Sequence, residues 1–170
     1  MARDRLTALA LAALLALLPI PALAGAGPDP ASEKPERKLV IYQAFTRLFG
    51  NKQTANAPWG TVDQNGVGKF ADFDDKALEG IKQLGVSHIW YTGVPHHALV
   101  GDYTAYGISI DDPDVVKGRA GSPYAVKDYY NVNPDLANDP ARRLEEFRAL
   151  IERSHQHGLK VMIDIVPNHV

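Results

Sequence analysis

The chain has 170 residues, a formal net charge of −2 and no cysteine. Its 20 acidic and 18 basic side chains nearly cancel, so no electrostatic attraction to nucleic acid or to an anionic membrane surface is expected. Because no disulfide can form, an apolar core has to hold the fold alone.

Residues 1–24 have the layout of a secretory signal peptide. Arg3 and Arg5 give a basic start, an apolar run follows over 6–18, and the small residues of a cleavage site stand at 22–24. The apolar run is shorter than the roughly 20 residues that cross a bilayer, which disfavours a membrane anchor. We therefore predict an exported protein, secreted or periplasmic, with no stable membrane span after cleavage.

The folded part is expected to begin only after a linker. Residues 25–38 hold three prolines and many charged side chains, a composition that is typical of a flexible segment without a fold of its own. Residues 39–170 then remain as one domain of common size.

Three apolar stretches are predicted as strands: 39–45, 86–94 and 159–166. Each is short, rich in β-forming residues and almost free of polar side chains, which is typical of strands that are buried on both faces. Amphipathic segments separate the stretches, so strands and helices alternate along the chain.

Two helices are predicted between these strands. The first is expected to begin with Asp72 as its N-cap and to end at Gly85. The second begins at Asp139, followed by Pro140, and ends at Gly158. Apolar residues at three- and four-residue spacing form one stripe on each helix. The stripes are Phe73, Ala77, Ile81 and Leu84 on the first helix, and Leu144, Phe147, Leu150 and Ile151 on the second.

The order strand-helix-strand-helix-strand predicts a parallel sheet with right-handed crossovers. Two architectures fit this order, an open doubly wound sheet and part of a (β/α)₈ barrel, and the periodicity does not separate them. The first strand is not followed by the G-x-G-x-x-G pattern of a dinucleotide-binding fold. In both architectures a functional site is expected at the carboxyl ends of the strands.

The connection over 93–138 is unusually long for the link between a strand and a helix. Six of the chain's seven tyrosines lie in or beside it: Tyr91, Tyr103, Tyr106, Tyr124, Tyr129 and Tyr130. Aromatic rings with a hydroxyl suit stacking on the C–H face of a sugar, which would make the loop a ligand site. The same rings could instead form a small core beneath a long loop. The His96-His97 pair in this stretch gives no pattern that indicates a function.

A polar cluster follows the third predicted strand. Asp164 stands in the apolar run, on the face of Met162 and opposite Val161, where an unpaired charge is costly. It is either a structural carboxylate bonded to backbone amides or a functional group. Asn168 offers a carbonyl oxygen suited to Ca²⁺ and His169 a donor to a hydroxyl, although both also suit an ordinary turn.

The stretch "DIVPNH" (164–169) fills all four fixed positions of the motif D-x-V-x-N-H and resembles the third-strand motif of the α-amylase family of glycoside hydrolases. Two longer stretches are similar to this family as well. Residues 122–134 look like the segment before its second barrel helix, and 144–170 look like its passage from helix to third strand. The resemblance covers 39–170.

By this resemblance the fold is α/β, namely the first three strands and two helices of a (β/α)₈ TIM barrel, truncated after the third strand. The activity implied is retaining hydrolysis or transfer of α-glucosidic bonds, with an α-glucan or a maltooligosaccharide as substrate. The family pattern implies Tyr124 and His169 as substrate-binding residues, Asp164 as support for the site and Asn168 as a possible calcium ligand.

The catalytic groups of the family are not expected within this chain. Retaining hydrolysis uses two carboxylates about 5 Å apart, and in this family they follow the fourth and fifth strands. We therefore expect an N-terminal fragment that is inactive alone. A small non-catalytic glucan-binding module and an unrelated doubly wound domain are the alternatives. Ala125 and the segment 134–139 depart from the family pattern, which leaves the exact substrate open.

Overall fold

The structure is a computed structural model, and it describes residues 38–53 and 55–167. The predicted signal peptide (1–24) and all but the last residue of the predicted linker (25–38) lie outside the described residues, so both stay predictions. Among the helices that are described, none is long and apolar enough to cross a bilayer.

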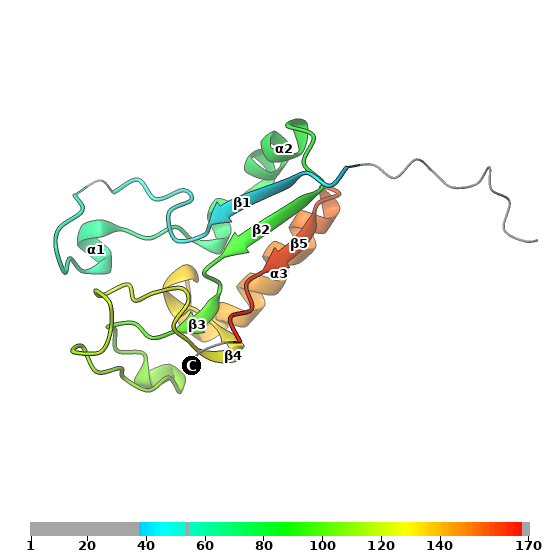
Figure 1. The fold of residues 1–170 in the computed structure, drawn as a ribbon. Helices are drawn as coiled ribbons and strands as arrows, with labels where there is room; N and C mark the ends of the chain where they lie inside the picture. The colour runs from blue at the N-terminus through cyan, green and yellow to red at the C-terminus, as the bar shows by residue number, and fades with distance from the viewer. Residues whose placement is uncertain (1–37, 54, 168–170) are drawn as a thin grey trace, which may run out of the picture. The chain divides into compact units, whose positions relative to one another are not determined.

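Three parallel strands form the main sheet, in the order β1-β2-β5 (Figure 1). They span Ile41–Phe45, His88–Thr92 and Lys160–Ile163, respectively. In the register of the sheet, Gln43 lies opposite Trp90, and Trp90 lies opposite Met162. The three predicted strands are thus confirmed in place and direction, although each is shorter than its apolar run.

The two long helices pack on one face of this sheet and enclose the core. α2 spans Asp75–Gln83 and α3 spans Arg143–Gln156, and Figure 1 shows α3 behind the strands. The core is one cluster of buried side chains from the sheet, both helices and the turns between them. Its largest fully buried members are Tyr91, Phe70, Phe73, Leu78, Ile89, Leu136, Leu150 and Leu159. Burying each such side chain stabilises the fold by roughly 1.5–3 kcal/mol.

The first long helix begins later than Asp72, so this N-cap prediction is wrong. Asp74 is the N-cap, and its carboxylate accepts a hydrogen bond from the Ala77 N–H at 2.8 Å. Asp72 instead ends the 3₁₀ turn Phe70–Asp72, where its carboxylate accepts from the Lys69 N–H at 2.7 Å. The chain forms this turn instead of starting the helix at Asp72, because the turn places the side chains of Phe70 and Phe73 in the core.

The predicted apolar stripes are confirmed in part. Ile81 on α2 and both Phe147 and Leu150 on α3 are buried, but Leu84 is 69% exposed. Leu84 is wrong as a core residue because it is the C-cap of α2 and lies beyond the turns that face the sheet. Leu78, which the stripe did not include, is fully buried.

The start of the second long helix agrees with the prediction. Asp139 caps the 3₁₀ turn Pro140–Arg142, which runs directly into α3, and its carboxylate accepts from the Ala141 N–H at 2.9 Å. Glycine follows both helices as expected. Gly85 and Gly158 have φ angles of +81° and +68°, in the left-handed region that favours glycine.

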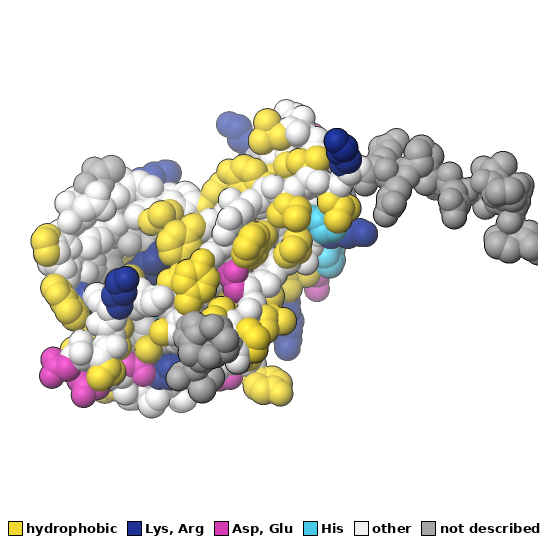
Figure 2. Space-filling model, in the orientation of Figure 1, with side chains coloured by type: hydrophobic (Ala, Val, Ile, Leu, Met, Phe, Trp, Pro, Cys, Tyr) yellow, Lys and Arg dark blue, Asp and Glu magenta, His cyan; other side chains and the backbone are white. Residues whose placement is uncertain are grey.

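The prediction that the strands are buried on both faces is wrong. α2 and α3 cover the same face, and no helix of the described residues covers the other, which we call the open face. Figure 2 shows apolar side chains gathered over the strands on this side of the molecule. The exposed apolar residues that alternate onto the open face are Leu39, Ile41, Phe45 and Met162. The apolar runs therefore reflect a sheet whose second face is apolar but uncovered.

The long connection 93–138 contains a second sheet, which was not predicted from the sequence. β3 (Pro95–His97) and β4 (Val126–Val132) pair antiparallel, with a register shift at each step of β3. The composition of β3, one proline and two histidines, carries no strand signal, which explains the miss. A short helix, α1 (Val62–Asn65), also lies in the loop after β1.

Candidate functional site

Asp164 lies one residue beyond β5 and is buried, as its place in an apolar run predicted. Its Oδ1 accepts a hydrogen bond from the Trp90 indole Nε1–H at 2.9 Å, and its Oδ2 accepts from the Gly93 N–H at 3.0 Å. Among the described residues, no cation pairs with it. Two neutral donors, one in β2 and one just after it, thus compensate the buried carboxylate. These hydrogen bonds also link the carboxyl ends of β2 and β5.

The open face has a further polar contact near the carboxyl ends of its strands. The Gln43 side-chain amide donates to the Thr92 hydroxyl at 2.9 Å, which links β1 to β2. Trp90 lies between Gln43 and Met162 in the register of the sheet, and its indole reaches Asp164. The two side-chain contacts Gln43–Thr92 and Trp90–Asp164 therefore link β1 to β2 and β2 to the end of β5.

Gly93 brings the Tyr124 loop to this end of the sheet. Its φ of +79° favours glycine, and a Cβ there would lie 3.2 Å from the Pro123 Cβ and 3.1 Å from the Phe45 ring. Because the Gly93 N–H also binds Asp164, Asp164 and the residue before Tyr124 both lie next to this backbone position. The side chain of Tyr124 is 49% exposed, so a ligand can reach it.

Asn168 and His169, the predicted calcium ligand and the predicted hydroxyl donor, lie outside the described residues. The backbone just before them is held to the second sheet, because the Val166 N–H donates to the Tyr129 hydroxyl at 2.9 Å. In the described part of the chain, no three His, Cys, Asp or Glu side chains are grouped to hold a metal ion. The roles of Asn168 and His169 therefore stay predictions.

The six tyrosines of the long connection do not form one ligand site. Tyr91 belongs to the core, where its hydroxyl hydrogen-bonds with Ser154 at 2.8 Å and burial raises its pKa to about 12. Tyr103 donates to Asp135, and burial together with that carboxylate raises the pKa of Tyr103. The exposed members are Tyr106, Tyr124, Tyr129 and Tyr130. Tyr91 and Tyr103 are thus structural, whereas a ligand role for the exposed rings stays a prediction.

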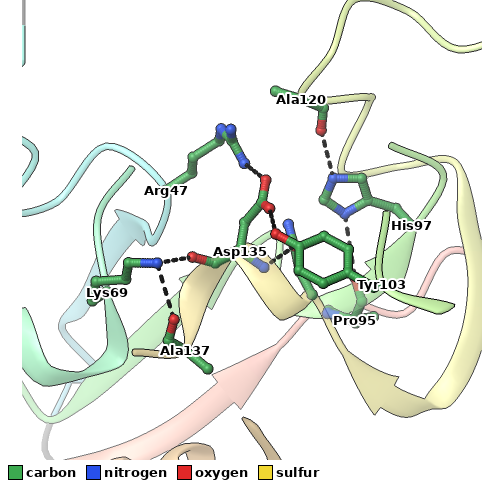
Figure 3. A network of polar contacts seen from close by, with 9 residues as sticks. Arg47, Lys69, Pro95, His97, Tyr103, Ala120, Asp135 and Ala137 are labelled. Carbon is green, nitrogen blue, oxygen red and sulfur yellow. Dashed lines mark hydrogen bonds and ion pairs between the residues drawn. The ribbon is translucent and has the colours of Figure 1, made fainter. Parts of the chain in front are cut away.

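Asp135 is the centre of a polar network that the sequence did not predict (Figure 3). It is 4% exposed, and its carboxylate accepts from the Arg47 guanidinium at 2.6 Å and from the Tyr103 hydroxyl. Its N–H donates to Asn133 Oδ1 at 2.9 Å, and its carbonyl oxygen accepts from the Lys69 ammonium at 2.6 Å. Since breaking a buried pair leaves an uncompensated charge, this network fixes separate loops relative to one another.

Lys69 holds the same segment through its backbone. Its ammonium donates to the carbonyl oxygens of Asp135 and Ala137, at 2.6 and 2.9 Å (Figure 3). Burial lowers the pKa of Lys69, and the nearby Asp135 carboxylate opposes that shift. A half-buried cation thus satisfies two carbonyl groups in the 134–139 segment, where the sequence departs from the family pattern.

Two buried histidines lie in β3. His97 contacts two carbonyl oxygens, that of Ala120 from Nε2 at 3.0 Å and that of Pro95 from Nδ1 at 3.3 Å. Burial lowers the pKa of His97, and the two carbonyl oxygens act in the opposite direction. His96 is 3% exposed, and its Nε2 has no partner among the described residues. Burial, followed by the charge of Lys127, lowers the pKa of His96 to about 4.

The Asp135 network has no local signal in the sequence. The stretch 132–137 is buried in the structure, but its sequence, VNPDLA, is not an apolar run in which a carboxylate stands out as Asp164 does. The partners of Asp135, Arg47 and Lys69, are 88 and 66 residues away, so no local spacing identifies them.

The described part is thus a partial α/β fold whose polar site stands at the carboxyl ends of parallel strands. The family model "Alpha amylase, catalytic domain" matches residues 44–170. The chain therefore belongs to the α-amylase family of glycoside hydrolases, which are enzymes, as the stretch 164–169 indicated.

The curated relatives are much longer than this chain. It is 28% identical over 133 residues to the trehalose-6-phosphate hydrolase of Bacillus subtilis (strain 168), covering 78% of this chain and 17% of that protein. It is 29% identical over 144 residues to an intracellular maltogenic amylase of Bacillus subtilis, covering 79% and 20%. A solved trehalose-6-phosphate hydrolase of Bacillus licheniformis is 25% identical, with a TM-score of 0.49, covering 78% of this chain and 17% of that one. The chain spans about a fifth of the length of the curated relatives it matches.

Proposed function

We propose that this chain is the N-terminal part of an exported α-amylase-family enzyme that hydrolyses or transfers α-glucosidic bonds with retention of configuration. The observation that carries the proposal is the position of Asp164. It follows the third strand of a parallel sheet, in the family's motif, and two donors hold it beside the loop of Tyr124. The match to the catalytic-domain model over 44–170 supports the same chemistry.

In this proposal, β1, β2 and β5 are the first three strands of a (β/α)₈ barrel. A closed barrel has eight strands and about 250 residues, and side chains fill its interior. The open face, with Ile41, Phe45 and Met162 exposed, is the surface that later strands would cover. Its apolar character supports the barrel, since a large apolar surface in water favours association with another surface.

The proposed substrate is a starch-like α-glucan or a maltooligosaccharide, in line with a maltogenic amylase among the relatives. Tyr124 stacks under the sugar at the cleavage point, and His169 donates to one of its hydroxyls. Asp164 holds the strand ends and thereby the positions of both residues. Asn168 supplies a carbonyl oxygen to a calcium ion, a hard cation that prefers oxygen ligands.

The residues of this chain would bind and orient the sugar rather than cleave it. Retaining cleavage uses a carboxylate nucleophile and a carboxylic acid about 5 Å apart. The family resemblance gives these groups to the fourth and fifth strands, which follow the three described here. We therefore expect the 170-residue chain alone to have no glycosidase activity.

The test compares the 170-residue chain with the complete product of its gene. Both are incubated with maltooligosaccharides, and NMR follows the anomeric form of the first product. We expect the complete product to release sugars with retained configuration and the shorter chain to release none. Cleavage by the shorter chain alone would overturn the division of roles. A folded complete product that acts on no α-glucoside would overturn the proposed function.

Two tyrosine variants of the complete product sharpen this test. Tyr124→Ala should lower kcat/KM by about fivefold, because a stacking contact worth roughly 1 kcal/mol is lost. Tyr124→Phe should keep most of the activity, since the ring remains. Tyr130→Ala is the matched control, because that side chain is 94% exposed in β4 and should not matter. An equal loss in both alanine variants would contradict a specific role for Tyr124.

Export is tested separately from activity. N-terminal sequencing of the protein recovered outside the cytoplasm should give a mature chain that begins after Ala24. Recovery of the protein in the cytoplasm with residues 1–24 still attached would contradict export and would leave the proposed chemistry untouched.

A further inference from the structure

We propose that the loops 47–66 and 117–120 form a binding site for a sugar that carries a phosphate or carboxylate group. Between these loops lies a cavity of about 230 Å³ whose charged lining residues are Arg47, Lys117 and Arg119. Among the described residues that line it, none is acidic. Arg47 is already paired with Asp135, so Lys117 and Arg119 supply the free positive charge of the site. Guanidinium and ammonium groups bind phosphate and carboxylate oxygens by charge-assisted hydrogen bonds.

Nearby acidic groups compensate the charge of Arg47 but not the charges of Lys117 and Arg119. A second cavity of about 210 Å³ shares Arg47 and Arg119 with the first and is also lined by Asp63 and Asp135. The Asp135 carboxylate is already bonded to Arg47 and Tyr103. Asp63 is exposed to solvent, where salt screens its charge. The cations of the 117–120 loop therefore stay available for a ligand.

The loop that carries these cations is fixed by its backbone. The Arg119 carbonyl oxygen accepts from the Val100 N–H at 2.8 Å, and the Ala120 carbonyl oxygen contacts His97 Nε2 at 3.0 Å. The side chains of Lys117 and Arg119, by contrast, make no hydrogen bond or ion pair with any described residue. A cation on an anchored backbone is placed to bind an external anion with little further ordering of the loop.

Trp59 on the other loop indicates that the anion is attached to a sugar. It lines the cavity and is 56% exposed. Its φ of +56° lies in the left-handed region, which is rare and costly for a bulky residue. The Asn65 side chain holds the loop in this shape, because it accepts from the Ala57 N–H at 2.7 Å and donates to the Ala57 carbonyl oxygen at 2.9 Å. An exposed indole on such a loop offers a stacking surface for a sugar ring.

This site is separate from the site around Asp164 and Tyr124 and does not rest on the proposed function. Figure 1 shows the loop after β1 beyond the carboxyl end of the sheet, so both sites stand at the same end of the strands. They share no residue, because neither Asp164 nor Tyr124 lines the cavity. Binding here can therefore be measured without any cleavage.

Isothermal titration calorimetry on the complete gene product tests the proposal with glucose 6-phosphate, glucuronate, glucose and inorganic phosphate. We expect one or both anionic sugars to bind at least about tenfold more tightly than glucose and inorganic phosphate, with an affinity that falls as salt is added. Tighter binding of glucose 6-phosphate identifies a phosphate site, and tighter binding of glucuronate a carboxylate site. Glucose or inorganic phosphate binding as tightly, or no saturable heat from either anionic sugar, would overturn the proposal.

Variants locate the binding. The double substitution Lys117→Gln and Arg119→Gln should weaken binding by at least about tenfold and leave the melting temperature unchanged, since neither side chain has a partner in the described part. Trp59→Ala should reduce the affinity for the anionic sugar to that for inorganic phosphate. Lys76→Gln, on the exposed surface of α2, is the matched control and should have no effect. Loss of binding in Tyr124→Ala, or no loss in the double variant, would overturn the proposed location.

Discussion

Two parts of this molecule are stabilised by different kinds of contact. The framework (β1, β2, β5, α2 and α3) is held by apolar side chains such as Leu150, which are fully buried in one cluster. The loop layer (46–53, 55–69 and 95–138) adds a few side chains such as Leu136 to that cluster, and charged groups also hold it, with Asp135 bonded to Arg47 at its centre. Apolar burial is almost independent of pH, whereas buried charges and imidazoles are not. The two parts should therefore respond differently to substitution and to acid.

The largest effect is expected in the framework. Leu150→Ala should lower the free energy of unfolding by about 2–5 kcal/mol, because it removes fully buried methyl groups and leaves a cavity. Ile165→Ala is the matched control. Its side chain is 74% exposed beyond β5, so the change should stay below about 0.5 kcal/mol. Urea unfolding followed by circular dichroism measures both, and equal losses would mean that the end of β5 is packed as tightly as the core.

The next largest effect is expected in the loop layer. Asp135→Asn should lower the free energy of unfolding by about 2–3 kcal/mol, because Arg47 then keeps a largely buried charge without a counter-charge. Replacing Arg47 by Met in the same chain should restore part of the loss. Asp114→Asn, at an exposed position, serves as the control. If Asp135→Asn lowers the free energy of unfolding no more than Asp114→Asn does, the buried ion pair does not stabilise the loop layer.

The framework could be predicted because each of its elements is encoded within a few residues. Asp139 and Gly158 bracket the second long helix in sequence as they do in the structure. Asp72 failed as an N-cap because a tertiary contact decides the turn before α2. The Phe70 ring packs against that of Phe147, with ring centroids 5.3 Å apart, and this burial outweighs a local capping preference.

The loop layer could be predicted only in outline. Tyr124 and Asp164 are predictable because a short family motif and a charge in an apolar run are both visible locally. In the structure, Gly93 binds Asp164 and lies against Pro123, the residue before Tyr124. The pair of Arg47 and Asp135 joins residues 88 apart. No periodicity or spacing in the sequence connects positions at that distance, so the contact exists only once the framework has folded.

The loop layer should also lose stability in acid through His96. Burial, followed by the charge of Lys127, lowers its folded pKa from 6.5 to about 4, although Asp111 and Asp128 act in the opposite direction. The unfolded state therefore binds the proton first, so this stability is present above the unfolded pKa and is lost as the pH falls from 6.5 toward 4. Between about pH 7.5 and about pH 5 the expected loss is about 2 kcal/mol.

Urea unfolding at both pH values isolates this contribution when the wild type is compared with His96→Gln. Because glutamine does not titrate, the variant's pH-dependent loss should be smaller by about 2 kcal/mol. His155→Gln, at an exposed position of α3, is the control and should keep the wild-type pH dependence. If His96→Gln lost as much stability in acid as the wild type, acid sensitivity would have to come from other groups of the chain.

The smallest effect, with the opposite sign, is expected in the framework at His157. Its Nε2 lies 3.0 Å from Asp75 Oδ1, and its Nδ1 lies 3.5 Å from Glu79 Oε2, so it joins the end of α3 to α2. The hydrogen bond with Asp75 raises the pKa of His157, and Glu79 acts in the same direction. The stabilisation is therefore fully present below the ordinary pKa of 6.5 and is lost as the pH rises through the raised folded value.

Two measurements check this clamp between α2 and α3. An NMR titration of the His157 ring should give a pKa above 6.5 that falls toward it as salt is added, because the pair is exposed. His157→Gln should remove a small gain in stability at acidic pH and leave the stability at alkaline pH unchanged. Protonation of His96 lowers the stability in acid, whereas protonation of His157 raises it. The double variant His96→Gln/His157→Gln should therefore show a weaker pH dependence of stability than His157→Gln alone. A measured His157 pKa at or below its ordinary value would contradict this prediction. His157 would then not contribute to the pH dependence of the framework's stability.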